Sequence, residues 1–270
     1  MPIQTQKTKV LITVKTYPVP SQKYQEVVCT AGITESGEWV RLYPIDYRYL
    51  KPEAQYKKYQ WIELDLQPRG AGGDKRKESR KPSLETIQLL GEPLSTKKGW
   101  AERRQIIDKL PHHTVKQYQA LYDENGTSLG VVRPSKILDM TIEKIEIDWN
   151  AKQTGILSQQ RLFGEQPKEL SKIPYKFSYV FECEDNEKPH TAMCEDWELG
   201  VLFLKERQHL GSDEKAAESV KNKFLNELCA PDKDSRFFMG TVFPYNTWVV
   251  LGVFYPPQTD DQPKQLSLFD

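Results

Sequence analysis

Short runs of alternating apolar and polar residues dominate the first third of the chain. In Trp61–Leu66, Ile62, Leu64 and Leu66 alternate with two carboxylates, which is the period of a half-buried strand. Runs rich in β-branched and aromatic residues predict further strands at residues 10–14, 27–33 and 39–43. Gly37 lies between the last two, and glycine accepts the positive φ of a tight hairpin. The pattern therefore predicts a small barrel.

The rest of the chain mixes helical and strand patterns. Residues 100–122 read as helical, but Pro111 breaks the segment into two helices. Strands are predicted at residues 136–149 and 175–182, and apolar spacing predicts a helix over 213–228. Two apolar runs, 237–243 and 248–255, predict a final hairpin.

This order predicts an α+β, strand-rich fold with two small β-barrel units of the oligonucleotide-binding (OB) type, helical connectors and a disordered C-terminal tail. The predicted divisions are a basic barrel unit at 1–98, a helical connector at 99–134, a β unit with one helix at 135–255 and a tail at 256–270. On the runs 29–33 and 39–43, the body is similar to uncharacterised bacterial proteins with paired barrels of this type.

The net charge of zero conceals an asymmetry. Residues 1–104 hold 19 Lys and Arg against 12 Asp and Glu, a net charge of +7, and the remainder carries −7. A polyanion is therefore expected to contact the front half, where aromatic residues lie beside a glycine-rich basic loop. Such a mixture suits single-stranded nucleic acid, since cations bind phosphates and rings stack on bases. The predicted nucleic-acid contacts are Arg41, Arg48, Arg69, Lys75, Arg76, Lys77, Arg80 and Lys81.

The C-terminal residues have the composition of a docking peptide. Residues 256–264 are rich in proline and charge and favour an extended linker. Beyond them Leu266, Leu268 and Phe269 are large apolar side chains, and Gln265 offers an amide donor and acceptor. Burying three such side chains contributes roughly 5–9 kcal/mol. Ordering the tail offsets several kcal/mol of that, so a roughly micromolar contact follows.

Residues 265–269 resemble the pentapeptide by which bacterial polymerases, mismatch-repair proteins and other DNA-processing factors bind the β sliding clamp. The resemblance covers the tail alone. It implies that Gln265, Leu266, Leu268 and Phe269 bind a cleft of that clamp. The alternative is a terminus that folds back on its own body.

Metal and enzyme motifs are incomplete. Cys183, His190 and Cys194 are a partial zinc set without a clear fourth ligand, and an acidic cluster at 195–198 is an alternative magnesium site. No cofactor is predicted. The chain lacks a phosphate loop, a paired-histidine zinc-protease helix and a deaminase motif. These absences favour a binding protein, and the enzyme alternative stays open.

Four cysteines and no long apolar run predict a cytoplasmic protein without a membrane partner. The leading hypothesis is an accessory factor of bacterial DNA metabolism that docks on the sliding clamp and contacts DNA, single-stranded DNA included, through its front half. One alternative is a clamp-recruited, metal-dependent nuclease or base-processing enzyme in repair or defence against phage. Another is a clamp-blocking inhibitor from a mobile element.

Overall fold

The computed structural model describes residues 5–71, 74, 76–160, 166, 168–185, 188–242 and 246–259. The fold is mixed α+β and strand-rich, with few helices. It divides into two compact units. The first comprises Met1–Pro93 and Ile145–Pro174, and the second comprises Leu94–Lys144 and Tyr175–Asp270. The sequence-based division differs, because it placed 145–174 with the second unit.

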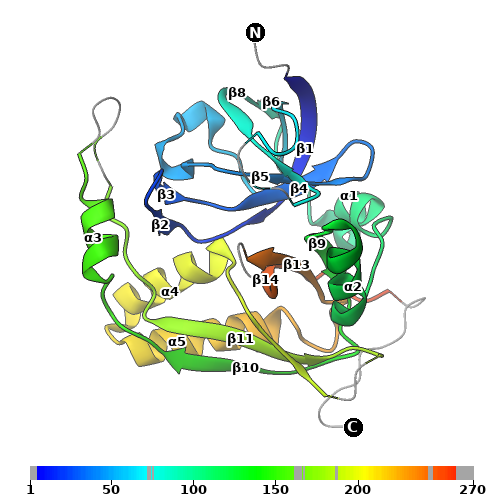
Figure 1. The fold of residues 1–270 in the computed structure, drawn as a ribbon. Coiled ribbons are helices and arrows are strands. Elements are labelled where there is room, and N and C mark those ends of the chain that lie inside the picture. Colours follow the sequence, from blue (N-terminus) through cyan, green and yellow to red (C-terminus); the bar gives the residue numbers. More distant parts are fainter. Residues whose placement is uncertain are drawn as a thin grey trace. The chain divides into compact units, whose positions relative to one another are not determined.

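The first unit is built on a six-stranded sheet with the order β7-β5-β4-β1-β6-β8 (Figure 1). Its elements are β1 (Gln6–Lys15), β2 (Val19–Ser21), β3 (Gln25–Val27), β4 (Thr30–Thr34), β5 (Trp39–Leu42), the 3-10 turns Tyr47–Tyr49 and Pro52–Ala54, β6 (Trp61–Leu66), β7 (Ser79–Arg80), β8 (Pro82–Leu90) and α3 (Ala151–Leu157). The strand predicted from alternation at 61–66 is confirmed as β6, with Ile62 and Leu64 buried as expected. The predicted strands 10–14 and 39–43 are confirmed as β1 and β5, whereas the predicted strand 27–33 is divided between β3 and β4. Gly37, at φ +82°, turns the chain between β4 and β5.

One extended segment forms both ends of this sheet. β7 pairs in parallel with β5, and β8 pairs antiparallel with β6. Only Lys81 separates β7 from β8. The carbonyl oxygen of Lys81 accepts a hydrogen bond from the backbone N–H of Gln67, at 2.9 Å. The glycine-rich basic loop predicted from the sequence, residues 69–82, therefore ends before Glu78, because Glu78 and Ser79 are buried where the chain joins β5.

The segment 145–174 completes the first unit through polar contacts. A capping box between Asn150 and Gln153 starts α3, which lies beside β2 and β3 (Figure 1). The Gln25 amide donates to the carbonyls of Leu157 and Gln159, at 3.1 and 2.7 Å. The buried carboxylate of Glu26 holds Arg48, which in turn bonds the backbone of 168–169. These long-range hydrogen bonds left no pattern in the sequence.

The second unit contains two three-stranded sheets, β10-β11-β12 and β14-β13-β9. Its elements are α1 (Lys97–Ile107), α2 (Val115–Asn125), β9 (Leu129–Val132), β10 (Lys136–Lys144), β11 (Tyr175–Glu182), β12 (His190–Met193), α4 (Trp197–Leu210), α5 (Asp213–Lys221), the π-helical turn Asn222–Glu227, β13 (Arg236–Val242) and β14 (Thr247–Phe254). The predicted break at Pro111 separates α1 from α2, and the predicted final hairpin is β13–β14.

A parallel bridge between Cys194 and Val250 connects the two sheets of this unit. We count β9 and β10 together as strand 1 of the second unit, and β11, β12, β13 and β14 as strands 2 to 5. Neighbouring strands in this unit then follow the order 1-2-3-5-4. The first unit has the same order, 1-2-3-5-4. Its strands 1, 2 and 3 are β1, β4 and β5, strand 5 is β7 continued by β8, and strand 4 is β6. In both units the third and fifth strands run in parallel.

Aromatic side chains fill the core of the second unit. The ring centroids of Tyr179 and Phe237 lie 4.6 Å apart, and Phe181 packs against Phe237 at 5.1 Å. Phe203 of α4 packs on Phe177 of β11, so the helix covers this side of the strand (Figure 1). None of the helices in the described part of the chain has the length and hydropathy needed to cross a bilayer.

We expect Gly130→Ala to destabilise the second unit by about 1–3 kcal/mol, the usual cost of overpacking a core. A Cβ at this position of β9 would lie 2.0 Å from Cζ of Tyr118. The ring cannot withdraw freely, because the Val131 amide donates to its hydroxyl at 2.9 Å. A urea titration should show a lower midpoint. Gly155→Ala in α3 is the control: no neighbour lies within 4 Å, so an unchanged or higher midpoint is expected. Equal effects of the two changes would contradict the packing argument.

Candidate nucleic-acid interface

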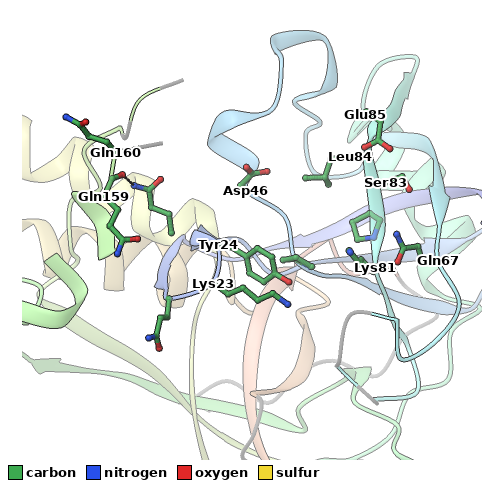
Figure 2. Close-up of a pocket in the computed structure, with 14 residues that line it drawn as sticks. Lys23, Tyr24, Asp46, Gln67, Lys81, Ser83, Leu84, Glu85, Gln159 and Gln160 are labelled. Carbon is green, nitrogen blue, oxygen red and sulfur yellow. Dashed lines mark hydrogen bonds between the residues drawn. The ribbon is translucent and has the colours of Figure 1, made fainter. Parts of the chain in front are cut away.

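A cavity of about 670 Å³ opens in the first unit (Figure 2). Its walls come from five separate stretches of the chain. Figure 2 shows Lys23 and Tyr24 on one side and Gln67, Lys81 and Ser83 on the other. The lining residues are Gln22, Lys23, Tyr24, Gln25, Pro44, Asp46, Gln67, Lys81, Pro82, Ser83, Leu84, Glu85, Gln159 and Gln160. This volume is within the range of small-molecule sites, about 300–1,000 Å³.

The turn between β2 and β3 presents Lys23 and Tyr24 to the cavity. Gln25, which closes the turn, has φ +65°, a conformation that costs a non-glycine residue on the order of 1–3 kcal/mol. The side-chain amide of Gln25 donates two hydrogen bonds, to the carbonyls of Leu157 and Gln159, at and just after the end of α3. These hydrogen bonds offset that strain and fix this wall of the cavity. Strained residues of this kind cluster at functional sites, so the turn is a strong candidate for a binding element.

The Tyr24 ring is held at a defined angle. Tyr43 meets it edge-on, with centroids 6.4 Å apart and an interplanar angle of 86°. The Lys23 ammonium lies 5.2 Å from the Tyr24 centroid, within cation–π distance. Burial, followed by the proximity of Tyr24, raises the pKa of Tyr43, which therefore stays protonated near neutral pH. Tyr24 is thus a half-buried, positioned platform for a stacking ligand.

Beside the cavity, the basic loop is ordered by its own carboxylate. Arg76 bonds Asp74 through two nitrogens, with a shortest N–O distance of 2.6 Å, and Ser79 donates to the same carboxylate at 2.8 Å. Burial alone would raise the pKa of Asp74, but these hydrogen bonds and the Arg76 charge lower it overall. The Arg76 charge is consequently neutralised within the loop, and the residue is a weaker phosphate contact than the sequence indicated.

The structure corrects the prediction for Arg41. This side chain is 1% exposed and donates to the Cys29 sulfur at 3.1 Å, so it supports the interior and does not reach a ligand. The Arg48 guanidinium makes a bidentate pair with Glu26, at 2.7 and 2.6 Å. It is therefore occupied in holding 145–174 to the unit.

The other predicted contacts have different positions. Lys81 lines the cavity. Arg80 bonds the carbonyls of Lys77 and Ser79, which stabilises the end of the loop. Arg69 and Lys77 are exposed, and Lys75 lies outside the described residues.

Sequence reasoning missed most of the cavity. Lys23, Tyr24, Asp46 and Gln67 were not predicted, although Lys23 and Tyr24 repeat the pairing of a cation with an aromatic ring that drew attention to the basic loop. The glutamines gave no signal, because only the fold brings them together.

A second polar site, the Asp234 cluster, lies in the second unit and comprises Asp234, Arg236, Arg104, Arg133, Asp108 and His112. Asp234 pairs with Arg236 at 2.5 Å, Arg104 at 3.2 Å and Arg133 at 2.8 Å. Nη1 of Arg236 lies 3.2 Å from Nε2 of His112. Because Arg only donates, Nε2 must accept, and the imidazole is neutral.

The charges around His112 agree with that assignment. Desolvation, followed by the charges of Arg236 and Arg133, lowers the pKa of His112 to about 4. Its basic nitrogen is occupied by Arg236, so His112 is not free to act as a general base in this arrangement. Arg104 also donates to the carbonyl of Pro257, which ties the chain after β14 to the cluster. The Asp234 cluster therefore has a structural role in the second unit.

The three predicted zinc residues are not brought together. Cys194 bonds the backbone of Phe177, near the start of β11, whereas Cys183 follows the end of that strand. Six residues of strand separate those levels by about 20 Å. The described part of the chain contains no group of three or more His, Cys, Asp or Glu residues arranged to hold a metal ion. All four cysteines are described, and none forms a disulfide.

The predicted clamp contacts, Gln265, Leu266, Leu268 and Phe269, lie outside the described residues.

Two families of unassigned function match the chain. Residues 111–270 match Domain of unknown function (DUF8757), and residues 6–109 match Domain of unknown function (DUF8758). No curated protein matches the sequence.

Two solved structures align with most of the chain. One is a murine DNA binding protein bound with double-stranded DNA, at 8% identity and a TM-score of 0.32, covering 96% of this chain and 98% of that one. Another is a Replication Protein A heterotrimer bound to single-stranded DNA, at 10% identity and a TM-score of 0.26, covering 94% and 66%. At these scores neither alignment carries an argument about fold or function.

Proposed function

We propose that this chain, which belongs to the family described as Domain of unknown function (DUF8757), binds single-stranded DNA in the cavity of its first unit. We propose further that residues 265–269 bring it to the bacterial sliding clamp. The observation that carries the first proposal is the meeting of Tyr24, Lys23 and Lys81 around one cavity. An aromatic platform beside ammonium groups is the combination that single strands require, because bases stack while phosphates pair with cations.

The strand order supports an OB-type barrel in each unit. OB folds are five-stranded, partly open Greek-key barrels whose ligands contact the loops after the first and fourth strands. In the first unit, the corresponding connections are residues 16–29, which contain the Lys23–Tyr24 turn, and residues 67–78, which contain the basic loop. Gln67 from the second connection and Tyr24 from the first both line the cavity. The cavity thus lies where an OB barrel would bind an oligonucleotide.

Clamp docking would complement a modest groove. Tethering at the clamp raises the local concentration of DNA around the protein, so an intrinsically weak contact becomes sufficient. The support for docking is the sequence of residues 265–269 and the proline-rich, charged segment 256–264 that precedes it. We infer an accessory factor of bacterial DNA metabolism on these two grounds.

A charge-reversal experiment tests the DNA-binding proposal. We expect the double variant Lys23→Glu, Lys81→Glu to bind single-stranded DNA more weakly. It should also reduce the slope of log K against log salt by roughly 1.4, about 0.7 for each lost phosphate contact. Fluorescence anisotropy with a labelled oligonucleotide from low to moderate salt measures both quantities.

Lys57→Glu is the matched control, because Lys57 is exposed in the same unit and does not line the cavity. Its slope should match that of the unmodified protein. If the double variant and the control behave alike, or if the unmodified protein has no salt-dependent affinity, the cavity is not the DNA site.

A further inference from the structure

The cavity walls carry balanced charge, which distinguishes this site from a groove that binds only phosphates. Lys23 and Lys81 contribute two positive charges, and Asp46 and Glu85 contribute two negative ones. A site that follows a phosphate backbone needs excess positive charge. The interior is better matched to a neutral ligand with many hydrogen-bonding groups, while the lysines meet phosphates at its edge.

Carboxamides are the commonest polar group in these walls. Gln25 is occupied in fixing α3, but Gln22, Gln67, Gln159 and Gln160 also line the cavity. Each amide offers a donor and an acceptor in one plane. This geometry matches the edge of an unpaired base, and glutamine pairs especially with N6 and N7 of adenine.

The carboxylates select further among the bases. In Figure 2 Asp46 lies above Tyr24, and Glu85 lies near Ser83 and Leu84. An ionised carboxylate only accepts hydrogen bonds, so it favours a base that carries an exocyclic amine. Adenine, cytosine and guanine have one, whereas thymine presents carbonyl oxygens at the corresponding positions.

We infer that the cavity holds one unstacked nucleobase with an exocyclic amine, foremost adenine, stacked on Tyr24 and recognised by the carboxamides and carboxylates. This inference rests on the proposed DNA binding and adds base specificity to it. Tyr24 supplies affinity for any base, since every base has a stacking face. Gln67 and the other carboxamides that line the cavity supply the choice among bases.

The test uses the full chain and oligothymidines of about twelve nucleotides, a length within the span of one OB-type site. A single central thymidine is replaced by dA, dC or dG, and affinity is measured by anisotropy. We expect the dA substitution to raise affinity by about 5- to 100-fold, the size of one well-made base contact. Gln67→Leu should reduce that preference severalfold, measured as the ratio of the affinities for the dA-containing oligonucleotide and for oligothymidine.

Gln88→Leu is the control for Gln67→Leu, because Gln88 is exposed on β8 outside the cavity. It should leave the preference intact. Tyr24→Ala should weaken binding to all four oligonucleotides, and circular dichroism checks that each variant remains folded.

The outcomes separate the two levels of the proposal. Equal affinity for all four oligonucleotides would overturn base recognition and leave DNA binding standing. No affinity for any of them would overturn both. A dA preference that survives Gln67→Leu and a Gln67→Leu, Gln160→Leu double variant would show that the carboxamides do not read the base.

Discussion

Asp234→Ala is expected to lower the free energy of unfolding by about 3–5 kcal/mol, the usual cost of removing one partner from a buried ion pair. The Asp234 side chain is 1% exposed and neutralises Arg236, which is 3% exposed, together with Arg104 and Arg133. Without it Arg104 and Arg236 share the partly exposed carboxylate of Asp108. Chemical denaturation of the full chain measures the loss.

Asp139→Ala is the matched control for this change. Asp139 pairs with Lys221 at 2.7 Å in the same unit, but its side chain is 47% exposed. Exposed pairs contribute about 0–1 kcal/mol. A similar loss in both variants would show that the Asp234 cluster is no more important than a surface pair.

Acid titration gives a second readout for Asp234. Burial alone would raise its pKa, but the hydrogen bond and charge of Arg236, with Arg133 and Arg104, lower it overall. A depressed carboxyl pKa contributes stability that is fully present above the unfolded value, near 3.9, and lost as pH falls through the folded one. The difference in stability between the unmodified protein and Asp234→Ala should therefore shrink below about pH 4.

Replacing Leu268 and Phe269 together by alanine should weaken binding to the purified β sliding clamp by at least about a hundredfold. Each large apolar side chain contributes roughly 1.5–3 kcal/mol when buried, and 1.4 kcal/mol is a factor of ten. Calorimetric titration of the full chain into the clamp measures the change. Gln265→Ala should have a smaller effect, because its amide sets register more than affinity.

The control for clamp docking is DNA affinity, which the tail variant should retain because the proposed DNA site is built from residues between Gln22 and Gln160. Clamp affinity that is unchanged by the double substitution, or absent in the unmodified protein, would remove the docking proposal. Single-stranded DNA binding would then stand or fall by itself.

Local patterns predicted the elements well. β6 was evident from alternation, the β4–β5 hairpin from Gly37, and the separation of α1 from α2 from Pro111, because each depends on neighbouring residues. Arg41 failed as a predicted ligand contact because both faces of β5 are buried near it, so alternation no longer marks an outward side chain.

Long-range polar contacts were beyond prediction. Gln25 meets Gln159 across a separation of 134 residues, and hydrogen bonds of this kind have no period in the sequence. The cavity has the same origin, since Lys23, Gln67, Lys81 and Gln160 come to line one cavity only in the folded chain. The candidate site could be predicted from the sequence only as a tendency of the front half to bind polyanions.

The placement of 145–174 within the first unit has a consequence for biosynthesis. During translation, residues 1–93 leave the ribosome well before the chain that supplies the acceptors for Gln25 and Arg48. Domains fold as their residues emerge, so the nascent first unit lacks the hydrogen-bond acceptors of 145–174 until residue 174 has been synthesised. A fragment that stops near residue 98 would never acquire these acceptors. A fragment designed to reproduce the whole first unit would need residues 1–93 joined to residues 145–174.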